Sequence, residues 1–412
     1  MKESVWSRRF FPVLLTYFID TFGLAIVYPI FTPLFLKPHF NLLAEGTLFQ
    51  RTFLLGLLIA SFPLAQLFGA PLIGSTSDRL GRKKVLIGTI TGGIIGYLLT
   101  GLGIQMRILP LLWIGRTITG FFAGNLSICL AAITDITHTK RERTRNFGWI
   151  GVLGGLGFVL AILCGGSFSN PDLDIFFRPD IPFFITAGLS AINLALLLKF
   201  FKESHKTKHH DKIDFLKSIK SIGLAIRSKG LRGIYVVYFL FMLCWVTSMQ
   251  FLSTYLIDVY NVSMNVITLT FVSIGIIWSL ANFIINPILS KLIQSSRTFY
   301  FGLAFLSIFL YLTLIPREPL FLFLFHFFVA TLAAALAWTN GLATISLNGE
   351  KHMQGSILGV NQSIVAGASI TGPIIGGIIA GLDIHKLYLF TATCSLAGAF
   401  LLFFRSFKVK QS

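Results

Sequence analysis

The stretch GSTSDRLGRKK, residues 74–84, lies between two apolar runs near residues 52–74 and 84–104. A helix needs about 20 apolar residues to cross the hydrocarbon core of a bilayer, so this stretch reads as a short polar loop between two membrane spans. Gly74 and Gly81 permit a tight turn, and Asp78 can accept hydrogen bonds from a helix amino terminus. A basic loop without a special role would explain the lysines and arginines, but not these three residues at these spacings.

Apolar runs of this length recur along the whole chain of 412 residues, of which 54% are hydrophobic and only 12% charged. This balance differs from that of soluble domains. The runs lie near residues 10–36, 52–74, 84–104, 109–133, 146–167, 181–200, 232–256, 266–290, 299–315, 320–346, 355–381 and 386–404. The sequence therefore predicts an all-α membrane protein with twelve transmembrane helices.

The net charge of +18 could suggest binding to nucleic acid. The distribution of the charge argues against this, because most lysines and arginines fall in the segments that would be cytoplasmic if the amino terminus is cytoplasmic. By the positive-inside rule, both termini should lie in the cytoplasm. The loops on the side of the membrane opposite the cytoplasm are short, which favours the inner membrane of a bacterium. We expect the partner of the chain to be the lipid bilayer and not nucleic acid.

A long polar interruption divides the twelve runs into two sets of six. We predict an amino-terminal bundle at residues 1–200, a cytoplasmic linker at 201–231 and a carboxy-terminal bundle at 232–412. Within the linker, apolar residues recur at helical spacing among lysines and arginines, which predicts an amphipathic basic helix on the inner leaflet. Weak repeats, such as Gly69-Ala-Pro71 against Ile285-Asn-Pro287, indicate that the two bundles are pseudo-symmetric copies.

Two charged residues interrupt apolar runs in the first bundle. Asp20 lies in the first run, where insertion scales put the cost of an acid at about 2.5 to 3.5 kcal/mol, so it calls for a partner or a function. Tyr17 falls on the same helical face, and Arg116 enters the fourth run to a comparable depth. We hypothesise that Asp20 and Arg116 form or exchange an ion pair that protonation of Asp20 releases. The alternative is a static pair that only holds two spans together.

Three of these segments resemble the major facilitator superfamily. Residues 74–84 match its loop signature, and Arg116-Thr-Ile-Thr-Gly120-Phe-Phe-Ala-Gly124 resembles its Arg-x-x-x-Gly-x-x-x-Gly element. Ile19-Asp20-Thr-Phe-Gly23-Leu-Ala-Ile-Val-Tyr-Pro29 is similar to the drug/proton antiporter subgroup that includes tetracycline exporters. The chain departs from that subgroup in the fifth run, where Ala161-Ile162 replaces Gly-Pro.

The resemblance implies an inner gate and a substrate cavity. The gate would consist of Gly74, Asp78, Arg79, Gly81, Arg82 and Asp135, with Asp135 paired to Arg82 or Arg79 until the inner face opens. Runs 1, 4, 7 and 10 would line the cavity, which makes Tyr17, Gln250 and Asn340 candidate substrate contacts. Other polar side chains in the runs are candidates for the cavity or for hydrogen bonds between helices: Gln66, Asn125, Asn282, Asn286, His326, Asn361 and Gln362.

The implied function is proton-coupled export of a small amphipathic compound by a monomer. An uptake symporter could use the same two residues, with Arg116 holding an anionic substrate. A membrane sensor that transports nothing is a third possibility, but it would predict a damaged cavity or gate. No cluster of histidines or acids near an interface supports an enzyme, and we predict no cofactor and no metal site.

Overall fold

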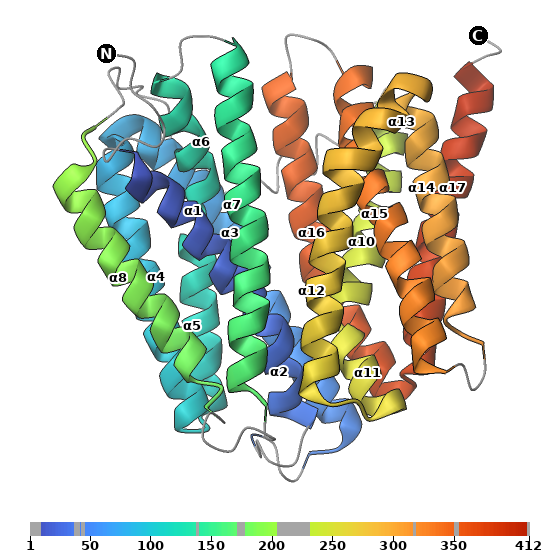
Figure 1. Ribbon diagram of the computed structural model, residues 1–412, viewed down its shortest axis with the longest axis horizontal. Coiled ribbons are helices and arrows are strands. Elements are labelled where there is room, and N and C mark those ends of the chain that lie inside the picture. The colour runs from blue at the N-terminus through green and yellow to red at the C-terminus, as the bar shows by residue number, and fades with distance from the viewer. Residues whose placement is uncertain are drawn as a thin grey trace. The chain divides into compact units, whose positions relative to one another are not determined.

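The computed structural model describes residues 10–36, 42, 46–136, 140–170, 178–203, 231–315, 319–349 and 354–409. All regular secondary structure in these residues is helical (Figure 1). Eleven helical segments within them are long and apolar enough to cross a membrane, and Val152–Phe168 is a shorter apolar helix. Together these twelve segments coincide with the twelve runs found in the sequence, which confirms the prediction of an all-α membrane protein. The predicted amphipathic helix of the linker falls on residues 204–230, outside the described residues.

The chain packs into two units. The first comprises Met1–Ala44 and Ser61–Lys217, and the second Glu45–Ala60 and Ser218–Ser412. Helices of the first unit are α1 (Phe11–Ala25), α2 (Val27–Leu36), most of α3 (Leu48–Leu80), α4 (Arg82–Gln105), α5 (Leu109–Phe122), α6 (Asn125–Ile136), α7 (Lys140–Phe168) and α8 (Ile181–Phe200). Within it, α4 packs against α5 and α8, and α1 packs against α7 and α8.

The second unit includes the first residues of α3 and a second set of helices. These are α10 (Arg232–Gln250), α11 (Leu252–Tyr260), α12 (Met264–Leu280), the π-helix η2 (Ala281–Ile285), α13 (Asn286–Leu292), α14 (Ser295–Leu312), α15 (Leu320–Asn348), α16 (Gln354–Leu382) and α17 (His385–Val409). Here α14 packs against α15 and α17, and α10 packs against α16 and α17.

Four of the described spans are interrupted. The seventh is divided at Phe251 into α10 and α11, and the other three are interrupted for different reasons. The first breaks at Ile26, three residues before Pro29, whose ring lacks an N–H donor and disturbs the preceding turn. The eighth carries η2 just before Pro287, a common way for a helix to absorb a proline. The fourth breaks at Ala123 and Gly124 without any proline, between α5 and α6.

Large apolar side chains cover the outer surface of the helices. Leu269 is 62% exposed, Phe321 74% and Phe400 62%. Apolar side chains exposed to this extent would favour aggregation in water, but they are expected where a helix contacts the acyl chains of lipids. The described helices therefore present a lipid-facing surface and keep their polar side chains for contacts inside each unit.

Candidate functional site

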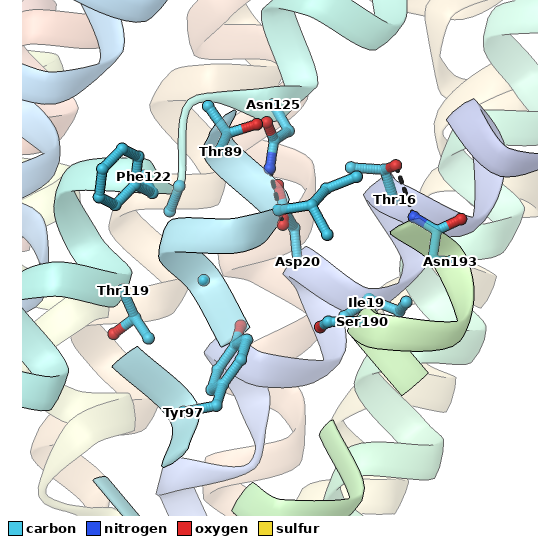
Figure 2. A pocket seen from close by; sticks show the side chains of 13 residues that line it. Thr16, Ile19, Asp20, Thr89, Tyr97, Thr119, Phe122, Asn125, Ser190 and Asn193 are labelled. Atoms are coloured by element: carbon cyan, nitrogen blue, oxygen red, sulfur yellow. Dashed lines mark hydrogen bonds between the residues drawn. The ribbon is translucent and has the colours of Figure 1, made fainter. Parts of the chain in front are cut away.

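A small polar cavity lies within the first unit around Asp20 (Figure 2). Side chains from α1, α4, α5, α6 and α8 line it: Thr16, Ile19, Asp20, Thr89, Ile90, Tyr97, Thr119, Phe122, Asn125, Ser190 and Asn193. The space fits about one water molecule, so it is the size of a small ion and not of a drug. Thus the acid predicted to lie inside a span faces a polar cavity instead of lipid.

Asp20 is held by an amide. Asn125 Nδ2 donates to Asp20 Oδ1 over 3.1 Å, across the contact between α1 and α6. Figure 2 shows the Asn125 side chain directed at the carboxylate. An amide donor stabilises the ionised form of a carboxylate without adding a charge of its own. Asp20 is therefore positioned by an uncharged donor and not by a cation.

The break in the fourth span places Asn125. Asn125 is the first residue of α6, directly after the interruption at Ala123 and Gly124. Gln66 Nε2 on α3 donates to the backbone oxygen of Ala123 over 2.6 Å, which satisfies a carbonyl that the break leaves free. Breaks of this kind, stabilised by a neighbouring helix, are typical of ion and substrate sites in transporters.

Glycines let α3 approach the broken span. A Cβ at Gly69 would collide with the backbone oxygen of Phe121, and one at Gly120 would collide with the backbone of Phe62. Gly120, a glycine of the Arg-x-x-x-Gly-x-x-x-Gly element, therefore leaves room for the neighbouring helix. The close approach brings Gln66 within reach of the break.

Arg116 lies in α5, 2% exposed, between two aromatic rings. Its guanidinium carbon is 4.6 Å from the centre of the Phe62 ring and 5.4 Å from that of Phe31. The Nε and Nη1 atoms find no hydrogen-bond acceptor among the described residues. The cation is thus stabilised by the faces of aromatic rings, and part of its donor capacity is unused.

Asp20 and Arg116 form no ion pair in this conformation, as judged from the described residues. Instead, the Tyr97 hydroxyl on α4 lies within electrostatic range of both groups. The carboxylate accepts from Asn125 and the guanidinium lies against the Phe62 ring, so the two charged groups have different neighbours. That the two residues exchange a pair during a transport cycle stays a prediction.

The predicted gate lies where α3 meets α4, but the prediction of a loop over residues 74–84 is wrong. Gly74, Asp78 and Arg79 belong to α3 and Arg82 begins α4, so Gly81 alone connects the two helices. Arg82 Nη1 pairs with Asp78 Oδ1 at 2.6 Å and donates to Ser77 Oγ at 2.6 Å. Gly81 has φ +98° and ψ 155°, a conformation that is essentially restricted to glycine. Arg79 is exposed, and Gly74 has no atom closer to an added Cβ than Ser127 Oγ at 4.0 Å. The side chain of Asp135 lies outside the described residues, so its predicted pairing with Arg82 or Arg79 stays a prediction.

A residue that sequence reasoning missed anchors this connection. Glu203, just beyond α8, accepts hydrogen bonds from the backbone N–H groups of Arg82 at 2.9 Å and of Lys83 at 3.1 Å. These are free donors at the amino terminus of α4, where a carboxylate is favourable. At α4, then, Glu203 rather than Asp78 accepts from the helix amino terminus. A Cβ at Gly81 would collide with the same carboxylate.

The second unit has an exposed ion pair between Lys386 and Asp383 at 3.5 Å, but the polar contacts that we find between its described helices are uncharged. Asn340 Nδ2 donates to Asn286 Oδ1 over 2.7 Å, and Thr339 bonds to Asn282, so both amides around η2 are bound by α15. Trp245 stacks on Trp278 with 5.4 Å between ring centres. Asn282, Asn286 and Asn340 thus make hydrogen bonds between helices, which was one of the two roles expected for such amides, while a substrate contact by Asn340 stays a prediction.

The two other candidate substrate contacts differ in their surroundings. Gln250 ends α10 and has a buried Oε1 without a hydrogen-bond donor among the described residues. Tyr17 packs against Leu14 and Ile133 and near Gly154 of α7, and it does not line the cavity around Asp20. Gln250 retains an open acceptor, whereas Tyr17 packs mainly with apolar neighbours.

Comparison with known proteins connects this geometry to a family. The model of the Major Facilitator Superfamily matches residues 13–302. The class H tetracycline resistance protein of Pasteurella multocida is 29% identical over 194 residues, which cover 47% of this chain and 44% of that protein. Multidrug resistance protein 2 of Bacillus subtilis (strain 168) is 26% identical over 97% of this chain and 96% of its own. The crystal structure of a D-xylose-proton symporter superposes with a TM-score of 0.75 at 14% identity, covering 95% of each chain, and shows the shared fold.

Proposed function

Because the chain belongs to the major facilitator superfamily, as its loop signature indicated, we propose that it exports a small amphipathic compound in exchange for protons. The relatives named for tetracycline and multidrug resistance support export. The single observation that carries the proposal is Asp20, an ionisable side chain inside a membrane span that faces a polar cavity and is held by Asn125.

In the proposed cycle, Asp20 binds the proton on one side of the membrane and releases it on the other. The Asn125 amide donates to Asp20 and so favours the ionised carboxylate, while removal from water favours the neutral acid. A rearrangement at the break before Asn125 would lengthen or restore that hydrogen bond and so change which form is favoured. Movement of α6 against α1 would therefore couple protonation to conformation.

The connection between α3 and α4 would act as the latch of the inner face. Asp78, Arg82 and Glu203 bind one another or the amino terminus of α4, so the end of α8 and this connection are linked by charge-assisted hydrogen bonds. Opening the inner face would rearrange contacts of this type. An intact latch and an intact polar cavity also argue against a sensor that transports nothing.

We place the protein as a monomer in the inner membrane of a bacterium, with both termini in the cytoplasm. The positive-inside distribution of lysine and arginine supports this orientation. Its partners are then the lipid bilayer, protons and a small-molecule substrate. The proposal involves no enzymatic step, no nucleic acid and no cofactor.

Export is tested in everted vesicles and proteoliposomes with an imposed pH gradient. We expect vesicles with an acidic interior to accumulate tetracycline or an amphipathic dye from a test panel. Asp20→Asn should abolish this accumulation, while Thr91→Val, an exposed hydroxyl on α4 away from the cavity, should leave it unchanged. Proton-driven accumulation that survives in Asp20→Asn would exclude the proposed role of Asp20.

One observation favours a second candidate, the uptake symporter. Arg116 is buried with Nε and Nη1 unbound to described residues, and a buried guanidinium with free donors suits an anionic substrate. Lysine cannot reproduce a bidentate contact with a carboxylate. Arg116→Lys should therefore eliminate uptake of an anion by a symporter, but retain part of the export of a neutral or cationic compound.

A further inference from the structure

The cavity around Asp20 is unusual in the type of polar atom that it presents. Four hydroxyl groups in its wall donate their protons to backbone carbonyls of their own helices. These bonds run from Thr16 to Pro12, Thr89 to Leu86, Thr119 to Gly115 and Ser190 to Thr186, with lengths between 2.8 and 3.1 Å. Because a hydroxyl has one proton and two lone pairs, these oxygens can only accept from, or coordinate, whatever occupies the cavity. One lone pair of Thr16 Oγ1 is already used, since it accepts from Asn193 Nδ2 over 2.8 Å.

Asn125 adds an oxygen that has no partner. Its Nδ2 donates to Asp20, which fixes the orientation of the amide. Its Oδ1 receives no hydrogen bond from the described residues, although the side chain is only 3% exposed. An amide oxygen buried without a partner costs about 1 to 3 kcal/mol, so an occupant that binds it is favoured. Asn125 and Thr89 line the same cavity as the carboxylate (Figure 2).

The charge of the site selects the kind of occupant. Asp20 supplies one negative charge, and the other polar groups of the cavity are neutral. They are the four hydroxyls whose protons are already used, the Tyr97 hydroxyl, and the amides of Asn125 and Asn193, whose Nδ2 atoms donate to Asp20 and Thr16. An anion is excluded by the carboxylate and the lone pairs. Calcium and magnesium prefer several carboxylates or retained waters, for which a space of about one water molecule leaves no room.

We propose that this cavity is a binding site for a monovalent cation, with sodium as the best fit, coordinated by Asp20, the Oδ1 of Asn125 and the hydroxyl of Thr89. Hard oxygen ligands beside an interrupted span are the usual surroundings of such an ion in transporters. The inference goes beyond the proposed function, because a cation can occupy the site whatever the protein transports and in whichever direction.

Sodium and the proton must then compete for Asp20, since a protonated carboxyl is a poor cation ligand. The titratable groups in electrostatic range of Asp20 are Tyr17, Tyr97 and Cys129, with Arg116 beyond Tyr97. Ordinary tyrosine and cysteine pKa values of about 10 and 8.5 lie above pH 7.5, and arginine keeps its charge. Between pH 7.5 and 6.0, Asp20 is therefore the group in this set whose protonation can weaken sodium binding.

The test measures equilibrium binding of ²²Na⁺ to the purified full-length protein, with choline chloride keeping the ionic strength constant. We expect saturable binding at pH 7.5 that weakens as the pH is lowered to 6.0. Asn125→Ala and Thr89→Val should each weaken it at least about tenfold, and Asp20→Asn should abolish it. Thr91→Val removes a hydroxyl from the same helix outside the cavity and should bind as the wild type does.

Absence of saturable binding in folded wild-type protein at every pH would overturn the inference, as would equal binding in wild type, Asn125→Ala and Asp20→Asn. Size-exclusion profiles establish that each variant is folded. If Asp20→Asn does not fold, Asn125→Ala and Thr89→Val still test the site. Proton-driven transport without sodium binding would refute the cation site and leave the proposed function intact. Sodium binding without proton-driven transport would refute the proposed function and leave the cation site intact.

Discussion

The two units differ in where they place charge. In the first unit, Asp20 and Arg116 lie inside membrane-spanning helices, in or near one polar cavity. In the second unit, the Lys, Arg, Asp and Glu residues of the described helices lie near helix ends, and the interior polar groups are amides, hydroxyls and a histidine. Trp245 and Trp278 stack beside these amides. The interior of the first unit thus contains side chains that carry charge, whereas the interior of the second contains amides and stacked aromatic rings.

The two connections at equivalent positions differ in the same sense. At the amino terminus of α4, Glu203 binds two free N–H groups and Gly81 adopts a conformation essentially restricted to glycine. At the amino terminus of α14, the capping residue Gln294 makes no side-chain hydrogen bond to the helix and has ordinary extended dihedral angles. Among the described residues, a carboxylate that caps the helix is therefore found at α4, on the unit that also holds Asp20.

The largest effect should come from removing the acid. Asp20→Asn is nearly isosteric and can still bond to Asn125, but it cannot take up or release a proton. Proton-driven substrate flux in proteoliposomes should fall to the level of liposomes without protein. Substrate binding measured without a gradient should persist, which separates loss of coupling from loss of the fold.

A smaller effect should follow from adding one methyl group to the connection between α3 and α4. Gly81→Ala forces alanine into a glycine-only region, which costs about 1 to 3 kcal/mol, and it also displaces the Glu203 carboxylate. Unfolding in mixed detergent micelles measures the loss of stability. Gly88→Ala is the control, because a Cβ on that glycine of α4 meets no atom within 4 Å. Equal stability of the two variants would contradict the geometry of this connection.

Neutralising the carboxylate that caps α4 should have a milder effect. Glu203→Gln retains one acceptor but loses the charge opposite the helix amino terminus, and capping interactions are worth about 1 kcal/mol. We expect a lower thermal midpoint in detergent that depends on salt concentration. Lys202→Gln changes the adjacent exposed charge and should leave the midpoint unaltered, and a similar shift in both variants would argue against a specific cap.

The smallest effect is expected in the second unit. Asn340→Ala removes one hydrogen bond to Asn286, worth about 1 kcal/mol. Since Asn340 is also a predicted substrate contact, losing one hydrogen bond of the same worth to the substrate should raise the half-saturating substrate concentration by about fivefold. The number of protons moved per substrate should stay the same. A changed number of protons per substrate in flux measurements would contradict the claim that ion coupling resides in the first unit.

Some features of this molecule could be predicted because they depend on local sequence. The spans follow from apolar length, and the tight turn at Gly81 follows from the loop signature. Asp20 and Asn125 could each be recognised as polar residues within a span. Their contact could not, because it depends on a break at Ala123 and Gly124 that no proline announces and that Gln66 of another helix stabilises.

Other features depend on contacts between distant residues. Glu203 sits next to a span end, where an acid is usually just solvated, and nothing in the local sequence connects it with Arg82 and Lys83. Tyr97 is one polar aromatic residue in an apolar run, and its place in the cavity with Asp20 follows only from the packing of α4. Such pairings are set by tertiary structure, which a single sequence encodes without local signals.

The central claim is that ion coupling resides in the first unit, at Asp20. The most direct measurement is proton release from detergent-purified protein in weakly buffered solution when saturating substrate is added. We predict release by the wild type and by Asn340→Ala, and none by Asp20→Asn. Undiminished proton release from Asp20→Asn would contradict the account.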